Sequence, residues 1–403
     1  MAESPPAQPP RLAIVNARYP LLWEGSSFVA GSLALAEGRI VGDDFAYPRP
    51  DALHFDAAGC VVLPGFIDLH IHGSAGHDTM DATPESLPAI SVFLAQHGVT
   101  SFTPTTMTAP HLSTLAALRN VSAALAQPMP GAAILGVHLE GPYISPLYPG
   151  AQAKENIRPA NLTEFGELLA AGPVALITLA PEEPGAGALI EAALAAGVGV
   201  IIGHSAASYE QAVAAFARGI RQATHTFNAM TALHQRKPGV VGAVLTDERI
   251  FAQLIADTVH VHPAAMAVLA RCKGPDRLLL ITDAIRATGL PDGKSELGGQ
   301  PVFVRDGQCR LADGTLAGSI LTMDAALRHF LAATGWPLEK AWPVTSRTPA
   351  AALGIGNQYG SIASGYRADL VVLDASLEVV ATIVGGRIVY LREGEGWRLA
   401  TGD

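Results

Sequence analysis

The sequence contains few cysteines, three in 403 residues, at Cys60, Cys272 and Cys309. They are scattered without paired spacing, which excludes a disulfide framework and a cysteine-rich zinc site. We therefore expect structural roles for all three and a reducing, cytoplasmic location for the chain.

Long apolar runs are also absent, although apolar residues make up 49% of the chain. No uninterrupted stretch reaches the roughly 18 residues that a membrane-spanning helix needs, and the most apolar one, residues 192–203, runs into His204. Residues 1–10 are rich in proline and lack the basic segment and apolar core of a secretory signal, so we predict a disordered tail. The formal net charge of −10, without a basic stripe, argues against nucleic-acid binding.

Short apolar runs alternate with alanine-rich helical stretches from Val61 onward, which is the pattern of βα units around a parallel sheet. The eight runs are residues 61–69, 99–103, 133–139, 174–179, 198–203, 220–224, 250–256 and 278–282. Eight strands with helices between them are the number that closes a barrel.

Both ends of the chain have a different pattern, in which short alternating strands are separated by turns. The predicted fold class is therefore α/β, with a (β/α)8 TIM-type barrel over residues 61–356. A small β-sandwich domain is expected from both termini, residues 11–60 and 357–403. Residues 290–316, rich in Gly and Asp, are expected to form a hairpin-bearing insertion after the eighth strand.

Candidate metal ligands stand where the predicted strands end, at the face of a barrel where reactive groups gather. The first strand ends in Asp68-Leu69-His70-Ile71-His72, and alternation along a strand points His70 and His72 to the same side. Both imidazoles can then reach one cation. A lone His-x-His in a loop is often incidental, but here it follows an apolar strand.

The third strand ends in His138-Leu139-Glu140, which puts a carboxylate at the rim of the barrel. Glu140 is predicted to ligate or bridge a metal; the alternative is a loop or capping carboxylate. His138 lies deeper on the same side, so we expect a buried, hydrogen-bonded histidine that is not a ligand.

The fifth and sixth strands each deliver a histidine, His204 and His225, at equivalent heights. With Glu140 they make a three-ligand site that leaves a position for water, as a hydrolytic metal requires. Asp283 follows the eighth strand and is costly to desolvate unless it meets a cation or a donor. Near a metal it can take a proton from water and give it to a leaving amine. His260, after the seventh strand, is expected to contact substrate, with a structural histidine as the alternative.

These motifs resemble the N-acetylglucosamine-6-phosphate deacetylases of the amidohydrolase superfamily, and the resemblance runs from about Pro64 to Leu373. It rests on the motifs Pro-Gly-Phe-Ile-Asp-Leu-His-Ile-His-Gly (64–73), His-Leu-Glu-Gly-Pro (138–142), Gly-His-Ser (203–205), Thr-His-Thr-Phe-Asn-Ala-Met (224–230), Thr-Asp-Ala (282–284) and Leu-Ala-Gly-Ser (316–319). It implies metal-dependent removal of acetate from N-acetylglucosamine 6-phosphate.

The resemblance also implies roles for single residues. Glu140, His204 and His225 would hold the metal common to the family, and Asp283 would be the catalytic acid and base. His70 and His72 match a pair that some members keep, so one or two divalent ions are expected, with zinc first and Fe, Co, Ni or Mn as alternatives.

The implied substrate contacts lie in three further segments. Asn228, Ala229, Arg236 and His260 match contacts to the sugar phosphate, and in the family Arg236 reaches the active site of the neighbouring subunit of a homodimer. Leu316, Ala317 and Gly318 match a loop that lines the sugar pocket.

Two departures from the family pattern affect the substrate site. The family usually has Gly-Ala-His where this chain has Gly150-Ala151-Gln152, and in the family that histidine helps to hold the substrate and to polarise its carbonyl. The resemblance therefore implies substrate contacts for Ala151 and Gln152, although glutamine can donate a hydrogen bond but cannot carry a proton charge. Thr258 stands where the family favours glycine, which can reshape the phosphate end of the pocket.

Two other functions remain open from the sequence. One is an amidohydrolase that acts on another N-acyl amino sugar or a cyclic amide, which only Gln152 and Thr258 favour. The other is an inactive homologue that serves as an interaction or scaffold protein, although such proteins usually lose metal ligands and here every candidate is present. The sugar epimer depends on details of the pocket that no spacing reveals.

Overall fold

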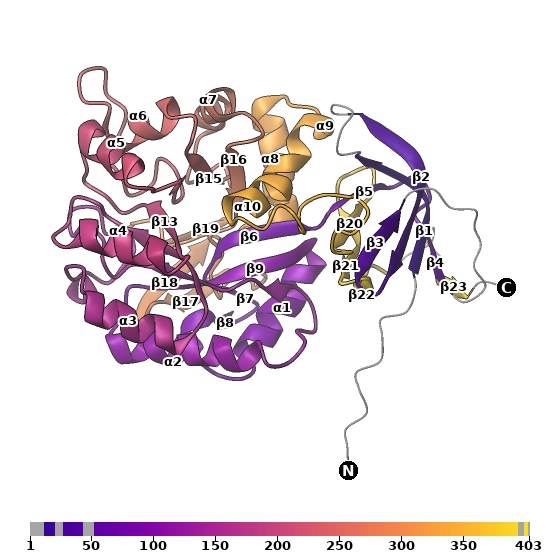
Figure 1. Ribbon diagram of the computed structural model, residues 1–403, viewed down its shortest axis with the longest axis horizontal. Coiled ribbons are helices and arrows are strands. Elements are labelled where there is room, and N and C mark those ends of the chain that lie inside the picture. The colour runs from indigo at the N-terminus through magenta and orange to yellow at the C-terminus, as the bar shows by residue number, and fades with distance from the viewer. Residues whose placement is uncertain (1–11, 21–26, 43–51, 394–398, 402–403) are drawn as a thin grey trace, which may run out of the picture.

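A parallel barrel forms the larger part of the computed structural model, which describes residues 12–20, 27–42, 52–393 and 399–401 (Figure 1). Its eight positions are filled by β6 (Phe66–Ile71), β9 (Val99–Thr106), β10 (Ala133–Ile134) with β11 (Val137–Glu140), β12 (Val174–Leu179), β13 (Gly199–Ile202), β14 (Gln222–Ala223), β15 (Phe251–Ile255) and β16 (Leu278–Ile281). The predicted (β/α)8 barrel is confirmed.

Backbone hydrogen bonds just beyond the strand ends join the first and last strands. Asp283 N donates to His70 O at 2.9 Å, and His72 N donates to Ala284 O at 2.9 Å. These bonds close the barrel at the end where the candidate ligands stand, so they also fix the position of Asp283 beside His70 and His72.

Helices follow the strands and cover the outside of the barrel (Figure 1). They are α1 (Ser86–Gln96), α2 (His111–Ala124), α3 (Leu162–Ala171), α4 (Ala186–Ala195), α5 (Tyr209–Ala217), α6 (Gly239–Thr246), α7 (Pro263–Lys273) and α8 (Met323–Thr334), with the short α9 (Leu338–Ala341) and α10 (Arg347–Ala352) after them. Side chains cap several helix starts: Asn161 accepts from two amides of α3, and Ser208 forms a capping box with Gln211 in α5.

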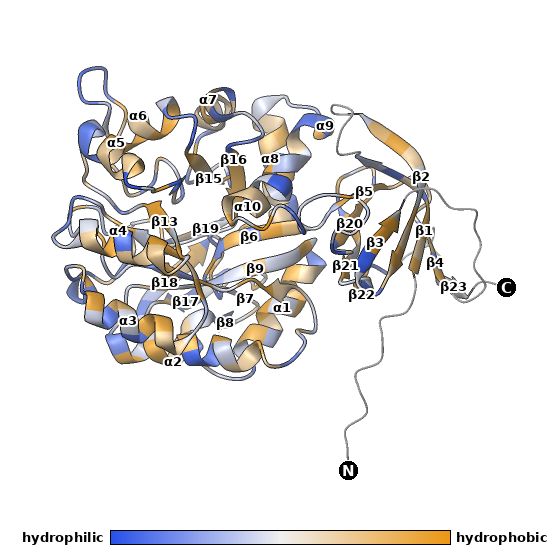
Figure 2. Ribbon diagram, in the orientation of Figure 1, coloured by the Kyte–Doolittle hydropathy of each residue, from blue (hydrophilic) through white to orange (hydrophobic). Residues whose placement is uncertain are grey.

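The core follows from this layering. Strands such as β13 and β16 are apolar and buried because parallel strands are covered on both faces. Helix α3 has both apolar and polar positions (Figure 2), with Phe165 and Leu168 buried and Glu167 exposed. None of the helices in the described ranges is both long and apolar enough to cross a membrane.

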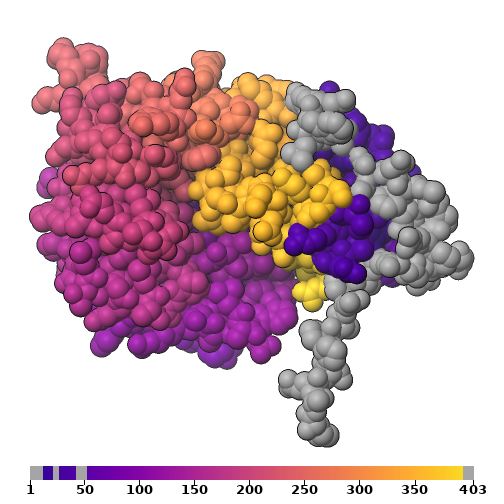
Figure 3. Space-filling view, in the orientation of Figure 1, coloured from indigo at the N-terminus to yellow at the C-terminus, as the bar shows by residue number. Residues whose placement is uncertain are grey.

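A second sheet combines segments from both ends of the chain. It has the order β22-β21-β20-β5-β1-β2-β3, with β4 and β23 paired beside it. Its strands are β1 (Leu12–Pro20), β2 (Phe28–Ala36), β3 (Arg39–Gly42), β4 (Leu53–Asp56), β5 (Val61–Pro64), β20 (Leu370–Leu373), β21 (Val379–Val384), β22 (Arg387–Leu391) and β23 (Leu399–Thr401). Figure 3 shows these indigo and yellow segments packed together on one side of the barrel. The predicted small β domain from both termini is confirmed, whereas the predicted tail, residues 1–10, lies outside the described residues.

The prediction of one strand over residues 61–69 was wrong, because two strands, β5 and β6, share this segment. The chain leaves the small sheet after β5 and enters the barrel with β6. Gly65 lies at this crossing, where its amide donates to Asp369 O at 2.9 Å and a Cβ atom would come within 2.1 Å of the Thr100 side chain. Residues of this one apolar run therefore pack in two hydrophobic cores, that of the small sheet and that of the barrel.

The insertion after the eighth strand is a separate antiparallel sheet. It consists of β17 (Gly293–Leu297), β18 (Gln300–Arg305) and β19 (Gln308–Leu311). Its inner face packs on Met107, Ile285 and Ala287, so the sheet lies over the same end of the barrel as the candidate ligands.

Candidate metal centre and pocket

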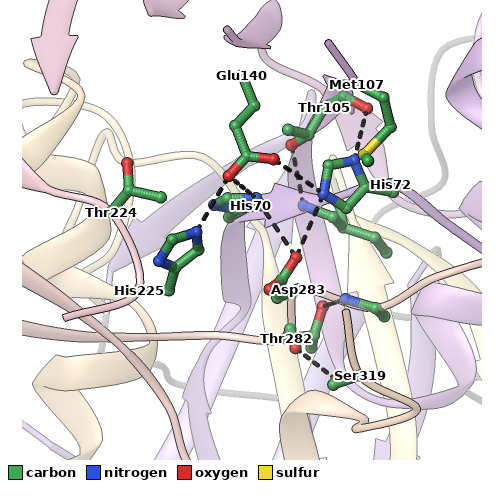
Figure 4. A network of polar contacts seen from close by, with 12 residues as sticks. His70, His72, Thr105, Met107, Glu140, Thr224, His225, Thr282, Asp283 and Ser319 are labelled. Carbon is green, nitrogen blue, oxygen red and sulfur yellow. Dashed lines mark hydrogen bonds and ion pairs between the residues drawn. The ribbon is translucent and has the colours of Figure 1, made fainter. Parts of the chain in front are cut away.

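Glu140, the last residue of β11, lies at the centre of a buried cluster of four histidines and one aspartate. Figure 4 shows Glu140 with three of these histidines and with Asp283. Its Oε1 atom lies 3.1 Å from His204 Nε2 and 3.1 Å from His225 Nε2. The same oxygen lies 3.4 Å from His70 Nε2, and Oε2 lies 3.3 Å from His72 Nε2. One carboxylate therefore faces imidazoles from three different strand ends.

Asp283 closes the cluster from the end of β16. Its Oδ1 atom lies 3.4 Å from His70 Nε2 and 3.3 Å from His72 Nε2 (Figure 4). Two possible three-residue sites result, one of His70, His72 and Glu140 and the other of Glu140, His204 and His225. Glu140 belongs to both groups.

The chemistry of the donors fits a cation. Nδ1 of His72 faces the carbonyl of Thr105 at 3.3 Å, and Nδ1 of His204 faces the carbonyl of Tyr148 at 3.0 Å. A carbonyl only accepts, so Nδ1 carries the proton in each neutral ring and Nε2 presents a lone pair. The Nε2 atoms of His204 and His225 lie 3.1 Å apart beside a carboxylate oxygen, an arrangement that a positive ion relieves.

Electrostatics within the cluster favour charged partners. Burial raises the pKa of Glu140, but His70, His204 and His225 outweigh it and hold that pKa well below its usual range. Burial likewise raises the pKa of Asp283, and the nearby His70 and His72 lower it to about 2. For His72, burial lowers the pKa, while hydrogen bonds to Asp283 and Glu140 raise it well above its ordinary value. Protons and a metal ion therefore compete for the same nitrogen.

The backbone at three of these positions is in the left-handed region, which residues other than glycine rarely adopt. The φ angles are +46° at His204, +26° at His225 and +51° at Asp283. Each such residue costs about 1–3 kcal/mol and persists only where its surroundings hold it. The bonds of Asp283 to His70 and of Ser319 N to Asp283 O, at 2.8 Å, hold one of them.

His138 is a buried, hydrogen-bonded histidine, as predicted. Its Nδ1 atom lies 3.1 Å from Leu69 O, and its Nε2 atom lies 2.8 Å from Thr178 Oγ1. Both ring nitrogens have partners, and burial strongly lowers the pKa of the ring. It therefore supports β11 from below without ligating an ion.

Gln152 lies against Glu140, the central residue of the cluster. Its Nε2 donates to Glu140 Oε2 at 2.6 Å, while its Oε1 accepts from Thr108 N at 2.7 Å. Gln152, which we predicted as a substrate contact, therefore also orients the carboxylate of Glu140 at the centre of the cluster.

A cavity of about 350 Å3 opens above the cluster. The expected site residues that line it are His72, Glu140, Ala151, Gln152, His204, His225, Asn228, Ala229, His260, Asp283, Leu316 and Gly318. Ala317 instead packs into the small core beneath β17–β19, and His70 lies under the floor of the cavity.

Two arginines, Arg236 and Arg310, differ in their position relative to the cavity. Arg236 is exposed on the loop after β14 and does not line the cavity. Arg310, on β19, does line it, and the sequence reasoning missed this residue. The only signal in the sequence was its closeness to the Leu316–Gly318 loop.

His260 lies on the wall of the cavity in a tight turn. Its Nδ1 atom is 2.6 Å from Asp257 Oδ2, and Asp257 Oδ1 accepts from the amides of Val259 and His260. Burial lowers the pKa of His260, but Asp257 raises it above its ordinary value. Thr258, in this turn, has φ +66°, which explains why glycine suits the position.

Comparison with known proteins agrees with this geometry. The pattern of the amidohydrolase family matches residues 61–389. The chain is 42% identical to the N-acetylgalactosamine-6-phosphate deacetylase of Escherichia coli O157:H7, over 81% of this chain and 87% of that protein. It is also 42% identical to the N-acetylglucosamine-6-phosphate deacetylase of Bacillus subtilis (strain 168), over 90% of this chain and 93% of that protein.

A solved structure is similar over nearly the whole chain. A mutant of the N-acetyl-D-glucosamine-6-phosphate deacetylase from Mycobacterium smegmatis, in complex with N-acetyl-D-glucosamine-6-phosphate, is 34% identical, with a TM-score of 0.87. The match covers 95% of this chain and 100% of that chain.

Proposed function

The chain belongs to the amidohydrolase family, and from this membership we propose that it hydrolyses the acetamide of N-acetylglucosamine 6-phosphate. The products are acetate and glucosamine 6-phosphate. The observation that carries the proposal is the convergence of four imidazoles and two carboxylates at one cavity, with His70 beneath its floor and the other five groups lining it. A cavity of about 350 Å3 is large enough for a monosaccharide phosphate.

Glu140, His204 and His225 would hold one divalent ion, and His70, His72 and Glu140 would hold a second. Zinc is the ion we propose first, with Fe, Co, Ni or Mn as alternatives. When bound, such an ion supplies the Lewis acidity that makes water a nucleophile near neutral pH.

Asp283 is the residue that moves the proton. Its low pKa keeps it ionised at neutral pH, so its carboxylate accepts a proton as water attacks the acetyl carbon. The bond between that carbon and the nitrogen then breaks, Asp283 returns the proton to the departing amine, and acetate remains. Gln152 keeps Glu140 in place during this sequence.

The walls of the cavity would orient the sugar phosphate. Asn228 and Ala229, which follow His225, and His260 lie there, and the raised pKa of His260 favours a positive charge that suits a phosphate. Leu316 and Gly318 line the sugar side.

We further propose a homodimer in which Arg236 completes the neighbouring site. The residue is exposed, and so are Leu147 and Leu233, by 77% and 57%, on the loops after β11 and β14 that also supply Gly150 and Ala229 to the cavity. A subunit contact would cover these apolar side chains. Mixing Asp283→Asn and Arg236→Gln subunits tests this, since hybrid dimers should restore about a quarter of wild-type activity. No recovery in the mixture would mean that Arg236 acts in its own subunit.

Three free cysteines suit the cytoplasmic location that we propose.

N-acetylgalactosamine 6-phosphate is a second candidate substrate, because one relative of equal identity is named for it. The test compares acetate release from both phosphorylated epimers and from unphosphorylated N-acetylglucosamine, using metal-replete protein. We expect the phosphorylated glucose epimer to be hydrolysed fastest and the unphosphorylated sugar slowest. Acetate from neither phosphorylated sugar would contradict the proposal and direct the search to other N-acyl sugars and cyclic amides.

A further inference from the structure

Arg310 stands on the face of β19 that borders the cavity. Its neighbour Cys309 is buried in the small core with Met107 and Leu297, and side chains alternate along a strand, so Arg310 points to the other face. It forms an isolated bridge with Leu316, which also lines the cavity. Residues that face each other in such a pair present their side chains to the same side.

The guanidinium group is held in a fixed position by neutral acceptors. Its Nε and one terminal nitrogen donate to Gln308 Oε1 at 3.1 and 2.8 Å, and the other terminal nitrogen donates to Gly314 O at 2.7 Å. Arginine has five N–H donors, so two remain for another partner. No carboxylate of the described residues pairs with it, and its charge is therefore not neutralised.

Arg310 is also the only lysine or arginine among the cavity-lining residues of the described chain. The other charges there include the carboxylates of Glu140 and Asp283, and the chain as a whole carries a formal charge of −10. An anionic ligand entering this cavity therefore meets one permanent positive charge from its own subunit. A fixed guanidinium fork with two free N–H groups matches phosphate oxygens well.

We propose that Arg310 is a substrate-binding residue that pairs with the phosphate group from within the same subunit, an inference that rests on the proposed function. It would act in addition to His260 and independently of Arg236. The role is specific to phosphate recognition, because Arg310 comes from the inserted sheet and is not part of the metal cluster.

The test measures steady-state acetate release by Arg310→Gln on phosphorylated and unphosphorylated N-acetylglucosamine. Arg305→Gln is the matched control, because it removes an equal charge from the same sheet but away from the cavity. Arg305 lies on β18, and its side chain is 88% exposed. A lost charge-assisted hydrogen bond should raise KM for the phosphorylated sugar roughly tenfold to a hundredfold, with little change in kcat. The unphosphorylated sugar and the Arg305 variant should behave as wild type does.

Three outcomes separate the explanations. If Arg310→Gln impairs both sugars equally, the residue supports the hairpin and the inference fails. If it changes neither, the inference also fails, while the proposed function stands because the wild type still releases acetate. If the wild type hydrolyses no phosphorylated sugar, the proposed function fails and this inference falls with it. Partial recovery of KM in Arg310→Lys would support the charge as the cause.

Discussion

Gln152 Nε2 donates a hydrogen bond of 2.6 Å to Oε2 of Glu140, the carboxylate shared by both candidate metal sites. The other end of the same amide is fixed by the Thr108 backbone at 2.7 Å. A neutral residue thereby orients the central carboxylate at a position where the family resemblance of the sequence leads us to expect histidine.

Replacing Gln152 with alanine should therefore weaken metal binding. Partners that orient a metal ligand typically contribute about 10- to 100-fold in affinity or activity. We expect Gln152→Ala to retain less metal after dialysis, measured by metal analysis. Its activity, measured by acetate release, should fall by a similar factor. Gln300→Ala, which loses only a bond to Ala151 O, is the control. Unchanged metal content in Gln152→Ala would show that Glu140 does not need this donor.

Metal affinity should fall as the pH decreases. The pKa of His72 in the metal-free cluster lies well above 6.5, so protons occupy its Nε2 atom first and a metal ion must displace them. We predict that metal affinity, measured by competition with a chelator, decreases steadily as the pH is lowered from above 6.5 to below it. Stripped protein should also melt at a lower temperature, because the ion binds only the folded state. Affinity independent of pH would argue against ligation by these imidazoles.

Asp324 should contribute stability that depends on pH. Burial raises its pKa, but His97 Nδ1 at 3.0 Å and Arg328 outweigh this and lower it to about 2. The folded pKa lies below the unfolded value of 3.8, so the contribution is present above about pH 4 and is lost as the pH falls toward 2.

The expected contribution near neutral pH is about 2 kcal/mol, and about half of it should remain at pH 3. Urea unfolding of wild type and Asp324→Asn at several pH values measures it as a difference that shrinks with acid. A difference that stays constant across that range would contradict the assignment.

Gly73→Ala should disturb the loop that follows His72. A Cβ atom there would lie 2.1 Å from His77 O and 3.0 Å from Asp78 Cα, which are backbone atoms that cannot turn aside. We expect a loss of about 1–3 kcal/mol in unfolding free energy, together with lower metal content. Gly293→Ala, where nothing lies within 4 Å, is the matched control and should be near neutral. Equal stability of the two variants would show that the loop relaxes freely.

The sequence predicted the barrel and the clustering of the candidate ligands because both depend on local order. Apolar runs mark strands, and parallel strands end at one face, so His70, Glu140, His204, His225 and Asp283 had to meet. The contact of Gln152 with Glu140 was not predictable, because it depends on how the loop after β11 folds back. Arg310 was missed for a similar reason, since nothing in its own strand indicates that the inserted sheet covers the cavity.

The most direct test of the account measures acetate release and bound metal in parallel for wild type and Asp283→Asn, with N-acetylglucosamine 6-phosphate as substrate. If Asp283 moves the proton, the variant should keep its metal and lose roughly 100- to 10,000-fold in kcat, the range for a positioned acid–base group. A variant that retains both its metal and near wild-type kcat would contradict the central claim.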